Sequence, residues 1–416
     1  MSNHKYYKPA LVALLLLLLP LAWFTERRLN VARQTLGLTR VAPLENAPPV
    51  LALTTQVLGG FRGLIANVLW IRANELQLSG KYFEMVQLAD WITKLQPHMA
   101  TVWAHQAWNM AYNISVKLPD PSDRWLWVDR GIRLLRDEGL RYNPTEINLY
   151  HELSRILHHK VGQNSDSGHM MYKYQVARQV EDILGSGRPD YEELLNPKTE
   201  GAKAKVKRLT TELKLDPVIM KEVDDSYGPL EWRLPETQAM YWAAAGMKKV
   251  KEGDKLTLRR VIYQSMQLAV QRGRMMENKF DKRMEFGPNI DMIPNANASY
   301  ERMMKEDPKA KEHIEQGHRN FLIQAVVNLY MFNRLTASQQ WFEYLKKKYP
   351  DVVWGMPNAT LDEYVVHRLT DDFANQGVDK LKGYIEGLLG QYYYNLAIGQ
   401  EDYAIGLERV AARVWR

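Results

Sequence analysis

Four histidines in the first half of the chain are the residues best suited to binding a metal ion. His151, His158 and His159 fall in one expected helix, and His169 follows a short polar loop. His151 and His158 are seven residues apart, or two helical turns, so we expect them to share a face. Zinc binding would require a nearby carboxylate, but Glu152 points elsewhere and the His-Glu-x-x-His spacing is absent. A half-exposed helix surface is the favoured interpretation, and we predict no metal site.

Acidic residues give no stronger indication of catalysis. Asp224 and Asp225 are adjacent and precede a Ser-Tyr-Gly-Pro sequence that is typical of a turn. Paired carboxylates for glycoside hydrolysis must converge in space, which adjacency along the chain does not establish. The sequence also has no P-loop, no dinucleotide-binding glycine motif and no Gly-x-Ser-x-Gly elbow. We therefore predict no catalytic residue, no cofactor and no enzymatic activity.

The composition excludes further classes of chemistry. The chain has 416 residues and no cysteine, which rules out disulfides, thiolate metal sites and cysteine nucleophiles. Its formal net charge of +7 is too small to indicate nucleic-acid binding unless the charges cluster. The basic run at 201–208 contains no aromatic residue, so we expect it on a solvated helix face. No nucleic-acid partner is predicted.

Residues 1–24 have the composition of a membrane anchor. The run from Ala10 to Phe24 has no charged residue and includes six consecutive leucines. With the residues before it, this run approaches the roughly 20 residues that span a bilayer core, and we expect residues 9–24 to contact lipid. Trp23 and Phe24 directly follow the only small residue near its end, which makes a poor signal-peptidase site. An uncleaved signal anchor is therefore favoured over a cleaved signal peptide and over a buried helix.

The orientation of this anchor depends on the basic residues on either side of it. Lys5 and Lys8 precede the apolar run, whereas Arg27 and Arg28 follow it, so basic residues flank both ends. A short basic leader normally stays in the cytoplasm while the rest of the chain is exported. We expect a single-pass inner-membrane protein with its body on the non-cytoplasmic side, and a cytoplasmic body is the alternative.

Helical periodicity dominates the chain after the anchor, without a convincing run of alternating strand residues. The clearest unit is residues 64–97, where the pattern predicts a helix, a turn at Ser79-Gly80, a second helix and a stop at Pro97. The apolar face of the second helix contains Tyr82, Met85, Ala89 and Ile92.

This unit resembles the tetratricopeptide repeat (TPR), a helix–turn–helix of about 34 residues. The matching features are Gly80 at the turn, Tyr82 two residues later, small Ala89 in the second helix, closing Pro97, and Trp103 where a following repeat often begins. The resemblance implies an all-α fold, a TPR-like array or α-solenoid with irregular insertions. It is fair at 318–350 and weak elsewhere, and a different α-solenoid or a bundle is the alternative.

The predicted organisation has five segments. Prolines and an asparagine-rich turn indicate that 277–308 is rich in loops. The segments are a transmembrane signal anchor (1–24), a juxtamembrane stalk (25–60), an N-terminal TPR-like array (61–185), an irregular helical middle with loop insertions (186–317), and C-terminal TPR-like helical pairs (318–416).

A concave groove is the functional surface that the resemblance implies, because the first helix of each repeat lines it. The corresponding residues here are Trp70, Asn74, Gln77, Trp108, Tyr112, His151, Arg155 and His158. Such a mixture can hold an extended peptide or a helix, and Arg155 can bind a carboxylate. For the tryptophans alone, packing between helices is favoured.

We therefore predict a membrane-anchored helical-repeat scaffold that binds a protein or peptide partner in a bacterial envelope assembly. The alternative is a hydrolase or ligand-binding protein that acts on cell-wall or lipid-derived molecules. A deep pocket with converging carboxylates or histidines would favour that alternative.

Overall fold

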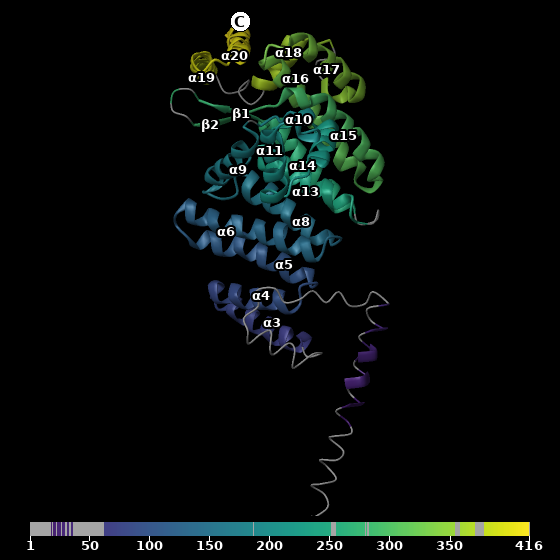
Figure 1. Cartoon of the computed structure of the whole chain (residues 1–416). Helices are drawn as coiled ribbons and strands as arrows, with labels where there is room; N and C mark the ends of the chain where they lie inside the picture. Colours follow the sequence, from purple (N-terminus) through teal and green to yellow (C-terminus); the bar gives the residue numbers. More distant parts are fainter. Residues whose placement is uncertain are drawn as a thin grey trace, which may run out of the picture. The chain divides into compact units, whose positions relative to one another are not determined.

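The computed structural model describes residues 62–185, 187–250, 255–278, 280, 283–353, 358–370 and 378–415, with scattered positions between 18 and 35. The chain divides into two compact units, Met1–Ile65 and Ala66–Arg416. Elements α4 to α20 belong to the second unit (Figure 1). The described residues are predominantly helical, so the all-α class is confirmed.

The first helical pair forms where the pattern predicts it. Helix α3 (Arg62–Leu78) and helix α4 (Tyr82–Leu95) are joined by a turn in which Gly80 has a φ of +74°. That backbone angle favours glycine, which lacks a Cβ. Met85, Ala89 and Ile92 are buried on α4, as their spacing predicts. Side chains of α3, including Ala73 and Leu76, pack against Met85.

The next three long helices each widen into a π-helix before they end. In a π-helix the backbone hydrogen bonds join residues five rather than four positions apart. The side chains that follow are therefore rotated from the α-helical register. The elements are α5 (Ala100–Trp108) with η2 (Asn109–Ile114) and the short η3 (Ser115–Lys117), α6 (Pro121–Arg133) with η4 (Leu134–Gly139) and α7 (Leu140–Tyr142), and α8 (Ile147–Arg155) with η5 (Ile156–Gly162).

Helix α13 lies at the centre of the main hydrophobic core. It packs against α8, η5, α12 and α14, and nearly all of its residues are buried. Gly246 allows the close approach of α8, because a Cβ there would lie 2.7 Å from the ring of Tyr150. The helices of this part of the chain are α9 (His169–Leu184), α10 (Tyr191–Leu195), α11 (Glu200–Glu212), α12 (Pro217–Tyr227), α13 (Pro235–Met247) and α14 (Lys255–Arg272).

The segment expected to be loop-rich, 277–308, is mostly regular, so that expectation is wrong. Strands β1 (Arg274–Glu277) and β2 (Met284–Gly287) form an antiparallel hairpin, and α15 (Ile293–Glu306) follows the short η7 (Ile290–Met292). Pro294 lies in the first turn of α15, where a missing backbone N–H costs nothing. Asn295 lies within α15 rather than in a turn, and its side-chain amide donates to the carbonyl of Gly228 at 2.8 Å.

The C-terminal part consists of further helical pairs. Gly399 has a φ of +81° at the turn between α19 and α20. One continuous core cluster contains residues from Trp103 to Ala411 and so includes these helices. The elements are η8 (Pro308–Ala310), α16 (Lys311–Met331), α17 (Leu335–Lys348), η9 (Pro350–Val353), α18 (Leu361–Thr370), α19 (Val378–Ala397) and α20 (Glu401–Trp415).

Within the described part of the chain, no helix combines the length and apolarity needed to cross a membrane. The predicted anchor, residues 1–24, and the predicted stalk, residues 25–60, lie largely outside the described residues. Both remain predictions from the sequence.

Two glycines of the last helical pair give a matched test of packing. A Cβ on Gly406 of α20 would lie 1.7 Å from the backbone oxygen of Met331 in α16, whereas a Cβ on Gly387 of α19 would meet nothing within 4 Å. We expect Gly406→Ala to destabilise the protein by about 1–3 kcal/mol or more through overpacking. Gly387→Ala should stabilise it by about 0.5–1 kcal/mol through helix propensity. Thermal unfolding followed by circular dichroism measures both changes, and shifts of the same sign would contradict the packing of α20 on α16.

Candidate functional site

Six half-buried side chains form a continuous surface that we call the aromatic face. They come from α3, α5, η2, α8 and η5. The residues are Trp70, His105, Trp108, Tyr112, Arg155 and His159. Four of them, Trp70, Trp108, Tyr112 and Arg155, belong to the predicted groove.

Ring contacts connect the aromatic face from one end to the other. The Trp70 and His105 rings meet edge to face with centroids 5.3 Å apart, and His105 lies 5.8 Å from Trp108. Trp108 stacks on Tyr112 at 6.4 Å. Tyr112 then contacts His159 at 5.9 Å, and its hydroxyl lies 3.3 Å from His159 Nδ1. These separations are within the range of favourable aromatic pairs.

Helical spacing accounts for part of this arrangement, and π-helices account for the rest. His105, Trp108 and Tyr112 are spaced three and four residues apart, so they follow one face of α5 and η2. His159 comes from η5, and the wider turn directs it toward Tyr112. π-Helical turns are frequent at functional sites, and this face is built on two of them.

Arg155 adds a cation to the face, and its charge is balanced by the carboxylate of Glu152. Its guanidinium lies 4.7 Å from the centre of the Tyr112 ring, a favourable cation–π distance. Its Nε and Nη2 atoms donate to the two carboxylate oxygens of Glu152 at 3.0 and 2.6 Å. The predicted carboxylate clamp is therefore already occupied by Glu152.

The titratable rings of the face remain neutral at neutral pH. Burial raises the pKa of Tyr112, so its phenol stays protonated. Burial also lowers the pKa of His105. It lowers the pKa of His159 too, with Arg155 and Lys160 acting in the same direction. The face thus presents neutral rings and hydrogen-bonding edges, which suit contact with a polypeptide rather than proton transfer.

The other predicted groove residues are placed differently. Asn74 is exposed and Gln77 is half-buried, and among the described residues neither side chain forms a hydrogen bond with the aromatic face. His151 is half-buried, and burial lowers its pKa, with Glu152 and Arg155 nearby. His158 lies away from the face, in the core.

The π-helix η5 explains the position of His158. His151 belongs to α8 and His158 to η5, so their seven-residue separation does not bring them onto a common face. His158 Nδ1 lies 3.1 Å from the Ser265 hydroxyl of α14, and His158 Nε2 lies 3.1 Å from the side-chain nitrogen of Gln163. This arrangement fits a neutral imidazole, and burial lowers the pKa of His158 to about 4.

A network of buried charges lies beside η5, and sequence reasoning missed it. Asp166 and Lys160 form an ion pair in which each side chain is only 3% exposed. Arg124 of α6 also binds Asp166, with a nitrogen–oxygen distance of 3.0 Å. Burial alone would raise the pKa of Asp166, but hydrogen bonds from Lys160 and from the Gly168 backbone hold it at about 2. The polar loop at 163–168 is thus fastened to the core by its own aspartate.

A second part of the network joins α9, α13 and α14. Arg272 Nε donates to Glu236 at 2.7 Å, and another of its nitrogens donates to the Gly162 carbonyl. The second carboxylate oxygen of Glu236 has no partner among the described residues, and complete burial raises the pKa of Glu236. Burial, with Arg272 close by, lowers the pKa of Lys173 to about 8. In the sequence, this network of buried charges is visible only as isolated charged residues within apolar helices.

No group of three or more histidine, aspartate or glutamate side chains suited to a metal ion occurs in the part of the chain that the structure describes. No family model, curated protein or solved structure matches the chain.

Acid stability tests the buried state of His158. The folded protein keeps this imidazole neutral down to about pH 4, whereas an unfolded histidine binds a proton below about pH 6.5. The unfolded state therefore gains protons first, and the free energy of unfolding should fall as the pH drops from about 6.5 to 4. We expect His158→Gln to remove up to about 3 kcal/mol of this pH dependence.

Urea unfolding between pH 4 and 7.5 measures the effect. Burial also lowers the pKa of His318 to about 4, so the variant should retain the part of the slope due to His318. An unchanged slope in His158→Gln would show that His158 is solvated.

Proposed function

We propose that this chain is a membrane-anchored helical-repeat scaffold, TPR-like in its helical pairs, that binds a protein or peptide partner in a bacterial envelope assembly. Its helical body is proposed to lie on the non-cytoplasmic side of the inner membrane. The partner is held on the aromatic face.

The continuity of the aromatic face is the observation that carries this proposal. Trp108 and Tyr112 are stacked and only half-buried, so their rings are held in place before a partner arrives. Tryptophan, tyrosine and arginine dominate the binding energy of protein interfaces. Because little side-chain freedom remains to be lost, such a surface binds at low entropic cost.

Pairing of the buried carboxylates favours a scaffold over a hydrolase. Glu152 is bound by Arg155, Asp166 by Lys160, and Glu236 by Arg272. A general acid or base must exchange a proton with its substrate within hydrogen-bond reach. Carboxylates that are buried and already bound by cations are poorly placed for that role.

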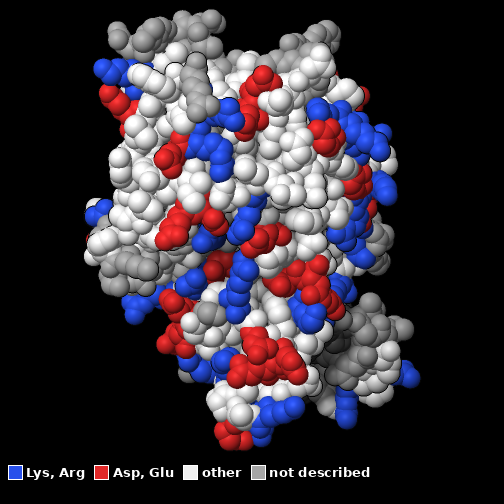
Figure 2. All heavy atoms as spheres, turned by 90° about the horizontal axis from the view of Figure 1, so that it is seen from above, with Lys and Arg blue, Asp and Glu red and all other residues white. Residues whose placement is uncertain are grey.

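The distribution of basic residues favours a protein partner over nucleic acid. In the run at 201–208, Lys203 pairs with Glu200, Lys205 with Glu193, and Arg208 with Asp182 and Glu212. On the face shown in Figure 2, acidic and basic side chains are interspersed. Nucleic-acid binding requires a patch or stripe of one sign.

A double substitution tests the aromatic face. We expect Tyr112→Ala with Arg155→Ala to reduce the recovery of cross-linked partners from membranes at least about tenfold, because it removes the stacked ring and the cation above it. Quantitative mass spectrometry after photo-cross-linking from position 108 measures the recovery.

Helix α9 offers a matched control. Arg178 lies 5.6 Å from the centre of the Tyr174 ring, so Tyr174→Ala with Arg178→Ala removes the same kind of pair elsewhere. This control should recover partners like the unmodified protein, and both variants should keep their helix content. Equal recovery from the two double variants would refute the aromatic face as the binding surface.

Membrane attachment is tested separately. We expect the chain to remain in membranes through alkaline extraction with its first 24 residues attached, because the leucine run is long and its cleavage site is poor. A mature chain that begins near Trp23 would contradict an uncleaved anchor. A reporter active only in the cytoplasm, fused after Arg416, should be inactive.

A further inference from the structure

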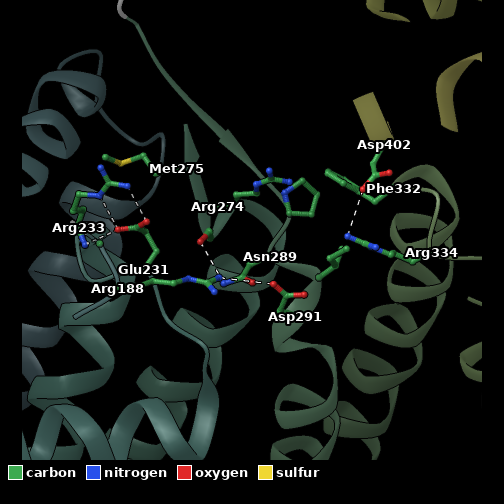
Figure 3. Close-up of a pocket in the computed structure, with 14 residues that line it drawn as sticks. Arg188, Glu231, Arg233, Arg274, Met275, Asn289, Asp291, Phe332, Arg334 and Asp402 are labelled. Carbon is green, nitrogen blue, oxygen red and sulfur yellow. Dashed lines mark hydrogen bonds and ion pairs between the residues drawn. The ribbon is translucent and has the colours of Figure 1, made fainter. Parts of the chain in front are cut away.

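Four arginines line one cavity of about 480 Å³, which we call the arginine pocket. None of its lining residues belongs to the aromatic face. Arg188 precedes α10, Arg233 precedes α13, Arg274 begins β1, and Arg334 precedes α17. Figure 3 shows Arg274 in the middle of the pocket, with Arg233 and Glu231 on one side and Arg334 and Asp402 on the other. The cavity has the size of a small-molecule site.

The walls of the arginine pocket are closely packed backbone. Asn289 is buried, and its side-chain amide donates to the Pro229 carbonyl at 2.8 Å, while its backbone N–H donates to Val270 at 2.9 Å. The backbone N–H of Trp232 donates to the Gly187 carbonyl at 2.7 Å. A Cβ on Gly187 would lie 1.4 Å from the Glu231 carboxylate, so a larger residue there would displace that side chain. The pocket is therefore preformed rather than a gap between loose loops.

One of the four arginines is fully engaged. Arg233 donates through Nε and Nη2 to the two oxygens of Glu231 at 2.8 and 3.0 Å, and it also lies 3.3 Å from Glu181. The Glu231 side chain is only 8% exposed. This pair neutralises the carboxylate in the wall, so Glu231 does not repel an anion in the cavity.

The other three arginines are exposed, and none of them is held by a buried carboxylate among the described residues. Arg188 lies 3.9 Å from Asp291, at the limit of an ion pair, and both side chains are mostly exposed. Arg334 lies 3.4 Å from Asp402, and these two are also mostly exposed. Exposed pairs of this kind contribute little free energy and rearrange readily. Arg274 is exposed, and its side chain forms no hydrogen bond or ion pair among the described residues.

We propose that the arginine pocket binds a ligand through a phosphate group. The guanidinium fork donates two parallel hydrogen bonds to a phosphate, and arginine is the side chain best suited to that geometry. Arg274 supplies the central fork, and Arg188 and Arg334 approach from opposite walls to neutralise the second negative charge of a phosphate. The ligand is a soluble phosphorylated compound or the headgroup of a phosphate-bearing lipid, since both carry the same chemistry.

Calorimetric titration of the full-length, detergent-solubilised protein tests this assignment. The probes are inorganic pyrophosphate, which represents a soluble ligand, and dihexanoyl phosphatidic acid, which represents a lipid headgroup. Arg274→Gln, alone and with Arg334→Gln, should raise the Kd of the bound probe at least about tenfold. Because Arg274 is exposed and has no ion-pair partner among the described residues, its substitution should leave the melting temperature unchanged.

Arg72 of α3 provides the matched control. Its side chain is 59% exposed, against 60% for Arg334, and it forms one surface ion pair with Glu75. Arg72→Gln should leave the Kd within about twofold, since it lies outside the pocket. Binding of pyrophosphate identifies a soluble ligand, and binding of phosphatidic acid alone identifies a lipid headgroup. Absence of binding to both probes, or equal weakening by Arg274→Gln and Arg72→Gln, would overturn the proposal.

Discussion

The pairing of Lys160 with Asp166 is the interaction on which the centre of this structure depends. A lysine and an aspartate removed from water are tolerated only when each satisfies the other. The Lys160 ammonium also lies 5.5 Å from the centre of the Tyr112 ring, and the neighbouring His159 contacts the hydroxyl of the same tyrosine. Asp166 simultaneously binds Arg124 of α6. A single buried carboxylate thus fixes the polar loop, the orientation of η5 and one end of the aromatic face.

A second buried ion pair, between Arg272 and Glu236, holds the core helices together in the same way. Arg272 at the end of α14 reaches Glu236 on α13 and the Gly162 carbonyl at the end of η5. Removing one partner of such a pair would leave an uncompensated charge, which is far more costly than removing a surface ion pair. The helices around α13 are consequently held by charge as well as by apolar contact. Burial of His158 against Ser265 reinforces the contact between η5 and α14.

Helical periodicity was sufficient to predict elements but insufficient to predict which side chains meet. The α3–α4 pair follows from Gly80 and from the spacing of Met85, Ala89 and Ile92, because those signals are local. His158 could not be placed, since a π-turn has no recognised signature in one sequence and rotates every residue after it. The α15 helix was missed because Pro294 at a helix start resembles proline in a loop. Its neighbour Asn295 serves a tertiary contact that no local pattern reveals.

The two proposed binding surfaces differ in how far the sequence could have revealed them. The aromatic face follows helices, and the resemblance to the tetratricopeptide repeat indicated Trp108, Tyr112 and Arg155 in a groove but not His105 or His159. The arginine pocket is assembled at the ends of helices and strands, where Arg188, Arg274 and Arg334 are separated by long stretches of chain. Such residues share no period and no motif. They meet in one cavity only because the hairpin, the segment before α10 and the connection between α16 and α17 are packed together in the fold. A site on connections held by a rigid core can change its side chains without disturbing that core, which is why recognition so often resides there. In this protein the helices carry the aromatic face, and the connections between helices and strands carry most of the arginine pocket.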